Sequence, residues 1–456
     1  PSVSAISSRF RLNSGGKRKT GEPPTAGDTG VAVNQTIQND IDMRHFIFAL
    51  LIAVMAWPSR AQERHEFRVK PGVEVLRDSG FEALMGKRVG LITNPTGVDN
   101  SLKATIDILK EAPEVELVAL FAPEHGVRGD ITAGATVGNT VDPATGVKVY
   151  SLYGATKKPT AEMLSGIDAL VYDIQDNGCR SYTFISTMAM AMEQCARLGK
   201  EFVVLDRPNP LGGNKVEGLC TDPDDISFVG YLPVPYIYGL TPGELAKMIV
   251  GEGMLKTDKP LNLTVVRMDG WERGMLFEDT AMPWVLPSPH IPTPQTAIYY
   301  PATGIAGELD YLSIGVGYTL PFRTFAAPWI NASRLAAKLN GMDIPGVAFR
   351  PIHYKPYYGF KRSENLQGVE LYITDYDAAP LTLIQFYVME ALAELYPAHK
   401  ALADAPVKRL SMFDKVTGSK KVRPVFFKNY KVADLLPLWN RDLESFKASK
   451  EKYHLY

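Results

Sequence analysis

The chain has 456 residues, of which 45% are hydrophobic and 22% are charged. This length and composition are typical of a globular protein with a large core and more than one domain. The formal net charge of -1 gives no electrostatic basis for binding nucleic acid or an anionic membrane, so neither is expected as a partner.

The N-terminus resembles a leader more than a folded segment. Residues 1–42 are polar and without periodicity, which predicts a disordered or mis-assigned extension. Residues 43–61 combine a basic start, an apolar run at 46–57 and small residues up to Ala61, which predicts a secretory signal peptide. The run is about twelve residues, too short to span a bilayer comfortably. We expect a periplasmic or secreted protein with no stable membrane span after cleavage; an uncleaved anchor is the alternative.

Apolar segments alternate with amphipathic ones from residue 88 onward. Strands are expected at 88–94, 115–126, 168–178, 201–213 and 261–271, and helices at 101–112, 160–167, 183–199 and 241–253. The strands are apolar on both faces, which predicts an α/β fold with a parallel sheet covered by helices.

A proline-rich segment follows this first unit. Six prolines, the first Pro283 and the last Pro301, occur in this segment, which predicts an irregular, ordered connection that could form a wall of a cleft. A second α/β unit is expected beyond it, with its clearest strand at 368–375 and its clearest helix at 379–397. The domains are therefore predicted at 62–290 and 291–456.

Polar side chains follow each of the predicted parallel strands. In an open parallel sheet, ligands bind at the carboxyl ends of the strands, so these side chains share one edge. The candidate site residues are Asn94, Glu124, His125, Arg128, Asp173, Asp176, Arg180, Tyr182, Asp206, Arg207 and Asn209. Carboxylates and guanidinium groups together fit a sugar or an acid as ligand. Each residue also has a structural alternative, such as capping a helix or pairing with a neighbour, and that alternative is favoured for Asp206 and Arg207.

Several familiar motifs are absent from the sequence. No glycine-rich nucleotide fingerprint, zinc-peptidase motif or serine-hydrolase elbow occurs, and the seven histidines are scattered. Three cysteines, Cys179, Cys195 and Cys220, form no metal-binding pair, and we expect free thiols, with one disulfide as the alternative. We therefore expect no metal and no cofactor.

Five blocks, in order, carry a resemblance to a known family. They are "FAPEHGVRGD", "VYDIQDNGCRSYTFISTM", "VVLDRPNPLGG", "SFVGYLPVPYIYGLTPGELA" and "PSPHIPTPQTAIYYPATG". Together they resemble bacterial exo-β-N-acetylmuramidases over roughly residues 68–456. The resemblance implies a Rossmann-like N-terminal domain, a smaller C-terminal α/β domain and an active site in the cleft between them. It also implies release of N-acetylmuramic acid from the non-reducing ends of peptidoglycan fragments or muropeptides, with Glu124 as leading acid candidate.

Two stretches depart from the family pattern. Many members read "DVGARFYTY" where this chain has Asp176 to Tyr182 in the order "DNGCRSY". Many also carry a Ser-Glu-Gly-Arg-Gly-Thr block where this chain has "LSIGVGYTLPF" at 312–322. The second replacement removes an acid and an arginine, which leaves open whether the substrate is ordinary muramic acid.

The expected reaction needs an acid at the leaving oxygen and a second group at the anomeric carbon. Glu124 is the predicted general acid, and Asp173 or Asp176 the base or nucleophile, unless the substrate's own 2-acetamido group attacks. Arg128 or Arg180 would grip the lactyl carboxylate, because a guanidinium fork matches a carboxylate. The competing hypothesis is a non-catalytic periplasmic protein that binds a cell-wall sugar; a nucleotide-dependent enzyme is disfavoured by the missing fingerprint.

Overall fold

The computed structural model describes residues 69–124, 126–129, 140–154 and 156–456. The predicted extension at 1–42 and the predicted signal peptide at 43–61 lie outside these ranges, as does His125. The described residues all belong to one compact unit. Within the described ranges, no helix has the length and apolar character that crossing a membrane requires.

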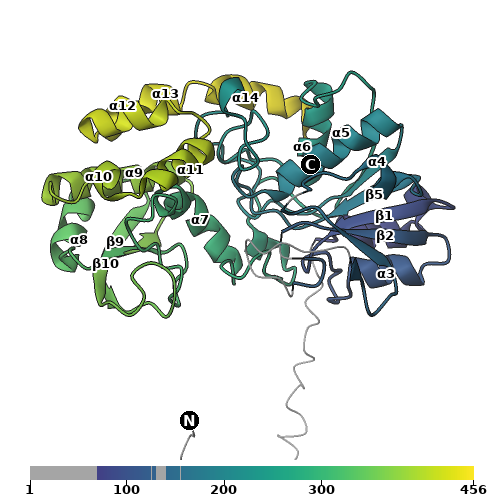
Figure 1. Ribbon diagram of the computed structural model, residues 1–456, viewed down its shortest axis with the longest axis horizontal. Coiled ribbons are helices and arrows are strands. Elements are labelled where there is room, and N and C mark those ends of the chain that lie inside the picture. Colours follow the sequence, from purple (N-terminus) through teal and green to yellow (C-terminus); the bar gives the residue numbers. More distant parts are fainter. Residues whose placement is uncertain (1–68, 125, 130–139, 155) are drawn as a thin grey trace, which may run out of the picture. The chain divides into compact units, whose positions relative to one another are not determined.

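A mostly parallel sheet forms the first half of the described chain (Figure 1). Its seven strands, among the described residues, lie in the order β3-β4-β2-β1-β5-β6-β7. Their bounds are β1 Arg88–Thr93, β2 Glu116–Ala122, β3 Thr140–Val141, β4 Lys148–Ser151, β5 Ala169–Asp173, β6 Glu201–Leu205 and β7 Asn262–Val266. Only β3 runs antiparallel to its neighbour. The predicted parallel sheet is confirmed.

Helices cover both faces of this sheet, as the doubly apolar strands require. Alternate residues of each strand enter different cores: in β5, Leu170 and Tyr172 pack on one face, and Ala169 and Val171 on the other. Figure 1 shows α3 and α5 on opposite sides of the strands. The covering helices are α2 Gly72–Asp78 and α3 Thr105–Glu111 on one face, and α4 Ala161–Leu164, α5 Phe184–Leu198 and α6 Pro242–Gly251 on the other.

The chain reverses direction across the sheet between β1 and β5. From β1 it passes outward through β2 to β4 and β3, and then returns to β5 on the other side of β1. Thr93 at the end of β1 lies in register with Asp173 at the end of β5. Ligands of open α/β sheets bind at such a switch point, outside the carboxyl ends of the strands. The residues that follow β1 and β5 therefore occupy the expected ligand crevice.

The second half contains a smaller antiparallel sheet packed against helices. Its order is β8-β10-β9, with β8 Thr324–Ala327, β9 Val347–Tyr354 and β10 Leu366–Ile373. The helices are α7 Pro294–Gly307, α8 Ala332–Asn340, α9 Leu381–Leu395, α10 Ala401–Asp404, α11 Val407–Thr417, α12 Val422–Asn429, α13 Val432–Trp439 and α14 Leu443–Lys450. Helix α8 packs on β9 and β10, while α9 packs on α7. The predicted C-terminal α/β domain is confirmed.

The prediction of an irregular connection up to Pro301 is wrong for its last part, because α7 begins at Pro294. Thr293 caps this helix by accepting a hydrogen bond from the Thr296 N–H at 3.3 Å. Pro294 occupies the first turn, where a missing N–H costs nothing. Pro301 lies inside the helix, and the Gln385 amide of α9 donates to its carbonyl at 2.9 Å. This contact holds α7 against α9 at Pro301, and local sequence rules cannot anticipate it.

Candidate active site at the sheet edge

The loop after β1 is joined to the loop after β5 by a short hydrogen-bond chain. The Asn94 side-chain oxygen accepts from the Thr96 N–H at 2.9 Å and also from the Thr96 hydroxyl. That hydroxyl in turn accepts from the Gln175 N–H at 2.8 Å. The Asn94 amide nitrogen is buried and has no partner in the part of the chain that the structure describes. The ends of β1 and β5 are thus held together, while the Asn94 amide N–H remains available to a ligand.

Asp176 is a fully buried carboxyl group just beyond β5. Its Oδ2 accepts hydrogen bonds from the Gly178 N–H at 2.8 Å and from the Tyr238 hydroxyl. Its Oδ1 is buried and has no partner among the described residues. Burial raises the pKa of Asp176 to about 6, against the lowering effect of these hydrogen bonds. Asp176 therefore changes charge near neutral pH with one oxygen unengaged.

Further unpartnered polar atoms come from the loop after β5. Both amide atoms of Asn177 and the side-chain oxygen of Gln175 are buried, and no residue in the described ranges forms a hydrogen bond with them. Buried polar groups in folded proteins are nearly always hydrogen-bonded, so a group of exceptions requires an explanation. Together with Asn94 and Asp176, they leave the loops after β1 and β5 with polar groups whose hydrogen bonding a polar ligand at this edge would complete.

Glu124 follows β2 and is partly buried. The Tyr153 hydroxyl, from the loop after β4, hydrogen-bonds to its carboxylate. Burial, followed by this hydrogen bond, raises the pKa of Tyr153 to about 12, so the phenol remains a donor. Glu124 therefore has access to solvent and one fixed neighbour.

Burial raises the pKa of the Tyr182 hydroxyl, and the charges of Asp176 and Glu124 raise it further. The Tyr182 ring meets Phe184 and Tyr300 edge to face, at 5.1 and 5.8 Å between centroids. Tyr300 belongs to α7, which opens the C-terminal half. Its hydroxyl also lies 3.1 Å from the Ser181 hydroxyl. Tyr182 and Ser181 thus lie where the sheet edge meets α7.

Asp173 is engaged on both oxygens. Arg207 forms a buried ion pair with it through Nε and through a second bond at 3.0 Å, and Thr105 donates to the same carboxylate. A fully paired carboxylate is poorly placed to act as a nucleophile or base. Between the two aspartates, the geometry favours Asp176 as the partner of Glu124.

Asp206 and Asn209 also have structural partners. Asp206 accepts from the Thr241 hydroxyl and the Gly243 N–H, both at 2.7 Å, and so anchors the start of α6. Burial raises the pKa of Asp206 to about 6. Asn209 donates to the Leu240 carbonyl at 2.9 Å and accepts from the Leu211 N–H at 2.9 Å.

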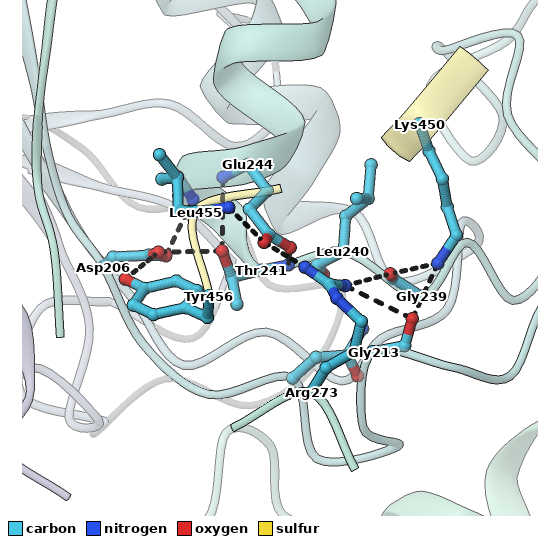
Figure 2. Close-up of polar contacts among 12 residues, drawn as sticks. Asp206, Gly213, Gly239, Leu240, Thr241, Glu244, Arg273, Lys450, Leu455 and Tyr456 are labelled. Carbon is cyan, nitrogen blue, oxygen red and sulfur yellow. Dashed lines mark hydrogen bonds and ion pairs between the residues drawn. The ribbon is translucent and has the colours of Figure 1, made fainter. Parts of the chain in front are cut away.

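The C-terminal residues are held against the same anchor (Figure 2). The Tyr456 hydroxyl donates to Asp206 at 2.8 Å, and the Leu455 N–H donates to Glu244 at 2.9 Å. Lys450 donates to the carbonyls of Gly213 and Gly239 at 2.6 and 2.9 Å. This network fixes the end of the chain to the sheet edge and engages the Asp206 carboxylate.

The two predicted arginine clamps differ in their surroundings. Arg180 is fully buried, and its guanidinium donates to four backbone carbonyls: those of Leu219, Val234, Val416 and Thr417. This geometry joins the two halves of the chain and leaves little of Arg180 for a substrate. Arg128 is partly exposed and pairs with Asp107 and Asp142, both at 3.0 Å. These ion pairs raise the pKa of Arg128 above its ordinary value.

Arg207→Ala is expected to reduce the free energy of unfolding by about 3–5 kcal/mol, because it leaves the Asp173 charge buried and unpaired. Urea unfolding followed by circular dichroism would measure the loss. Lys447→Ala removes one member of the exposed Lys447–Glu444 pair and serves as the control, with an expected cost below about 1 kcal/mol. Equal costs for the two variants would contradict the structural role of Arg207.

Sequence reasoning missed three residues of the site. Tyr153, Asn177 and Tyr238 contribute a phenol, an amide and a phenol around the two carboxyls. Asn177 directly follows Asp176, so its position was a usable signal. Tyr153 and Tyr238 reach Glu124 and Asp176 from other parts of the chain, and no local pattern indicates them.

Two further observations concern metal-binding groups and cysteine thiols in the described ranges. No group of three or more His, Cys, Asp or Glu side chains in the described ranges could hold a metal ion. Cys179, Cys195 and Cys220 are free, as predicted. The unpartnered groups at the sheet edge are amides and one carboxyl oxygen, which suit a polar organic ligand.

Comparison with known proteins identifies a matching family. Residues 89–295 match the family model of the N-terminal domain of the exo-beta-N-acetylmuramidase NamZ, and residues 298–456 match that of its C-terminal domain. The peptidoglycan beta-N-acetylmuramidase NamZ of Bacillus subtilis is 42% identical over 424 residues, which cover 91% of this chain and all of the relative.

Two crystal structures of DUF1343 family proteins from Bacteroides fragilis share the fold. One is 54% identical with a TM-score of 0.83, and the match covers 86% of this chain and 99% of that one. The other is 27% identical with a TM-score of 0.68, covering 85% of this chain and 99% of that one.

Proposed function

The chain belongs to the exo-β-N-acetylmuramidase NamZ family, and from this premise we propose that it is a glycoside hydrolase acting on peptidoglycan fragments. It removes N-acetylmuramic acid from their non-reducing ends. The observation that carries the proposal is that two carboxyls with different surroundings follow parallel strands at the same sheet edge. Glu124, after β2, is partly exposed, whereas Asp176, after β5, is buried with one oxygen unpartnered among the described residues. A non-catalytic sugar-binding protein would not need two carboxyls of such different environments at one edge.

In the proposed reaction, Glu124 donates a proton to the oxygen of the leaving sugar. Its partial exposure allows it to exchange protons with solvent, and Tyr153 holds its orientation. Asp176 is a poor nucleophile, because the carboxylate is fully buried and already accepts two hydrogen bonds on Oδ2. Its free Oδ1 is suited to accept the N–H of the 2-acetamido group. The acetamide oxygen then attacks the anomeric carbon, which is the substrate-assisted route among glycosidases.

Release of free N-acetylmuramic acid from muropeptides, followed by mass spectrometry, tests the activity directly. We expect wild-type protein to release the monosaccharide with turnover, and the Glu124→Gln variant to release almost none. Binding of muropeptides without any release would favour the non-catalytic alternative.

The anomeric outcome tests the route. Attack by the acetamido group followed by water retains the β-configuration, whereas direct attack by water inverts it. Proton NMR of the first product formed should therefore show the β-anomer. An α-anomer as first product would exclude the assignment of Asp176 to the acetamido group.

Arg128 is proposed to contact the lactyl carboxylate in exchange for its partly exposed ion pair with Asp107, since it lies four residues from Glu124 and is partly exposed. Arg128→Ala is expected to lower the preference for N-acetylmuramic acid over N-acetylglucosamine glycosides by about tenfold or more, because a charge-assisted contact to a carboxylate is lost. The ratio of kcat/KM values for the two nitrophenyl glycosides measures this preference. Arg88→Ala, an exposed arginine at the opposite end of β1, is the control. An unchanged ratio in Arg128→Ala would remove this residue from substrate recognition.

We further propose that the protein works in the periplasm or outside the cell, where peptidoglycan lies. The proposal is supported by the signal-peptide pattern at 43–61. N-terminal sequencing of exported protein should begin at Gln62.

A further inference from the structure

The segment at 312–322, which departs from the family pattern, supports a group of exposed aromatic side chains. Gly317 has a positive φ of 94°, and a Cβ there would collide with the Tyr358 carbonyl. The Gly317 carbonyl accepts a hydrogen bond from the Tyr357 N–H at 2.7 Å. The Ser313 hydroxyl accepts from the Tyr354 hydroxyl at 2.7 Å. The segment therefore fixes the end of β9 and the loop that follows it.

This loop presents tyrosine rings to solvent. Tyr357 is 69% exposed and Tyr358 50% exposed, which is unusual for large hydrophobic side chains in this chain. Tyr318 stacks on Tyr354 at 4.5 Å between centroids and lies nearly parallel to Tyr357 at 6.1 Å. We call Tyr318, Tyr357 and Tyr358 the tyrosine platform. Its rings are held by backbone and stacking contacts, so a ligand would bind them at little cost in conformational entropy.

Aromatic contacts connect the tyrosine platform and its supporting segment with Tyr182. The His290 ring stacks on Tyr358 at 5.9 Å, and its Nδ1 lies 3.3 Å from the Tyr358 hydroxyl. The Tyr182 ring meets Tyr300 at 5.8 Å, and Tyr300 meets Phe322, the last residue of the 312–322 segment, at 5.0 Å between centroids. A chain of sugars leaving the acids past Tyr182 would therefore run toward the platform.

The chemistry of the platform indicates its ligand. Flat aromatic faces bind the apolar C–H face of pyranose rings, because the negative face of the ring attracts those hydrogens. The same loop carries Lys355, Lys361 and Arg362, all exposed, which complement the carboxylates of an acidic glycan. Exposed aromatic patches of this kind mark interaction sites.

We propose that the tyrosine platform binds the sugars on the leaving-group side of the scissile bond, beginning with N-acetylglucosamine residues. The proposal rests on the proposed hydrolase activity and extends it, since it assigns the selection of longer fragments to the 312–322 segment and the loop after β9. The platform is a binding surface and takes no part in proton transfer.

Kinetics on a short and a long substrate test the platform. The short substrate is 4-nitrophenyl N-acetylmuramide, which has no sugar on the leaving-group side. The long one is a peptidoglycan tetrasaccharide with N-acetylmuramic acid at its non-reducing end. For the double variant Tyr357→Ala/Tyr358→Ala, we expect KM on the tetrasaccharide to rise by about tenfold, as for loss of an aromatic anchor. The kcat/KM on the nitrophenyl glycoside should stay within about twofold of wild type.

The control is Tyr357→Phe/Tyr358→Phe, which keeps the rings and should retain the wild-type KM on the tetrasaccharide. An unchanged tetrasaccharide KM in the alanine pair would overturn the proposal. An equal loss on both substrates would also overturn it, because the effect would then lie at the acids or in folding.

A binding measurement separates failure of the platform from failure of the proposed activity. If wild-type protein hydrolyses neither substrate, the proposed activity fails. The platform is then judged by calorimetric titration with N,N′,N″-triacetylchitotriose. Binding by wild type that weakens by about tenfold in the alanine pair supports the platform. Absent binding, or equal binding by both proteins, overturns it.

Discussion

Glu124→Gln is expected to lower kcat on a peptidoglycan oligosaccharide by about 10³-fold, because an amide cannot protonate the leaving sugar oxygen. The loss should be smaller on a 4-nitrophenyl muramide, whose leaving group needs little protonation. Comparing the two substrates therefore distinguishes loss of an acid from general damage to the site. The side chains are almost the same size, so Glu124→Gln should unfold at the temperature of wild type.

Glu116→Gln is the matched control, since Glu116 is exposed and opens the same strand at its other end. It should leave both substrates unaffected. Wild-type turnover of the oligosaccharide by Glu124→Gln would exclude Glu124 as the acid. A uniform loss on both substrates would point instead to a positioning role.

Asp176→Asn is expected to lower kcat by about 10²-fold or more and to remove an acid limb from the pH profile. The pKa of Asp176 is raised to about 6 by burial, so the carboxylate that accepts the acetamide N–H is present above pH 6 and lost below it. Wild-type kcat/KM should therefore fall as the pH drops through about 6. In Asp176→Asn, the remaining activity should not show this fall.

The same pKa predicts an effect on stability with a definite sign. The folded pKa of Asp176 lies above the usual unfolded value of about 3.9, so the folded state binds more protons between about pH 4 and 6. The stabilisation of the folded state that comes from this stronger proton binding is fully present below pH 4 and is lost as the pH rises through 6. The stability of Asp176→Asn relative to wild type should thus improve by up to about 3 kcal/mol between pH 4 and pH 7.

Asp206→Asn provides the control, because Asp206 is equally buried and its pKa is also raised to about 6. It should show the same pH-dependent gain in relative stability, measured by urea unfolding, while it keeps the acid limb of kcat/KM. Loss of the limb in Asp206→Asn, or its persistence in Asp176→Asn, would contradict the assignment.

The predictions of secondary structure were correct where they depended on a local pattern of apolar residues. Strands such as β5 are apolar on both faces, and this pattern alone predicts a strand between two helical layers. The predicted strands at 168–178 and 201–213 were too long, because β5 ends at Asp173 and β6 at Leu205. In each case the strand ends where the polar candidate residues begin.

The sequence by itself determined which residues reach the sheet edge, because the side-chain period of strands and the alternation of strands with helices are local properties. It placed Asp173, Asp176, Arg128 and Arg180 together as candidates without separating them. Only the tertiary structure did so, by pairing Asp173 with Arg207, surrounding Arg180 with four carbonyls and leaving Asp176 with a free oxygen. The physical reason is that a side chain's role depends on which partners satisfy its hydrogen bonds and charge, and those partners lie tens to hundreds of residues away.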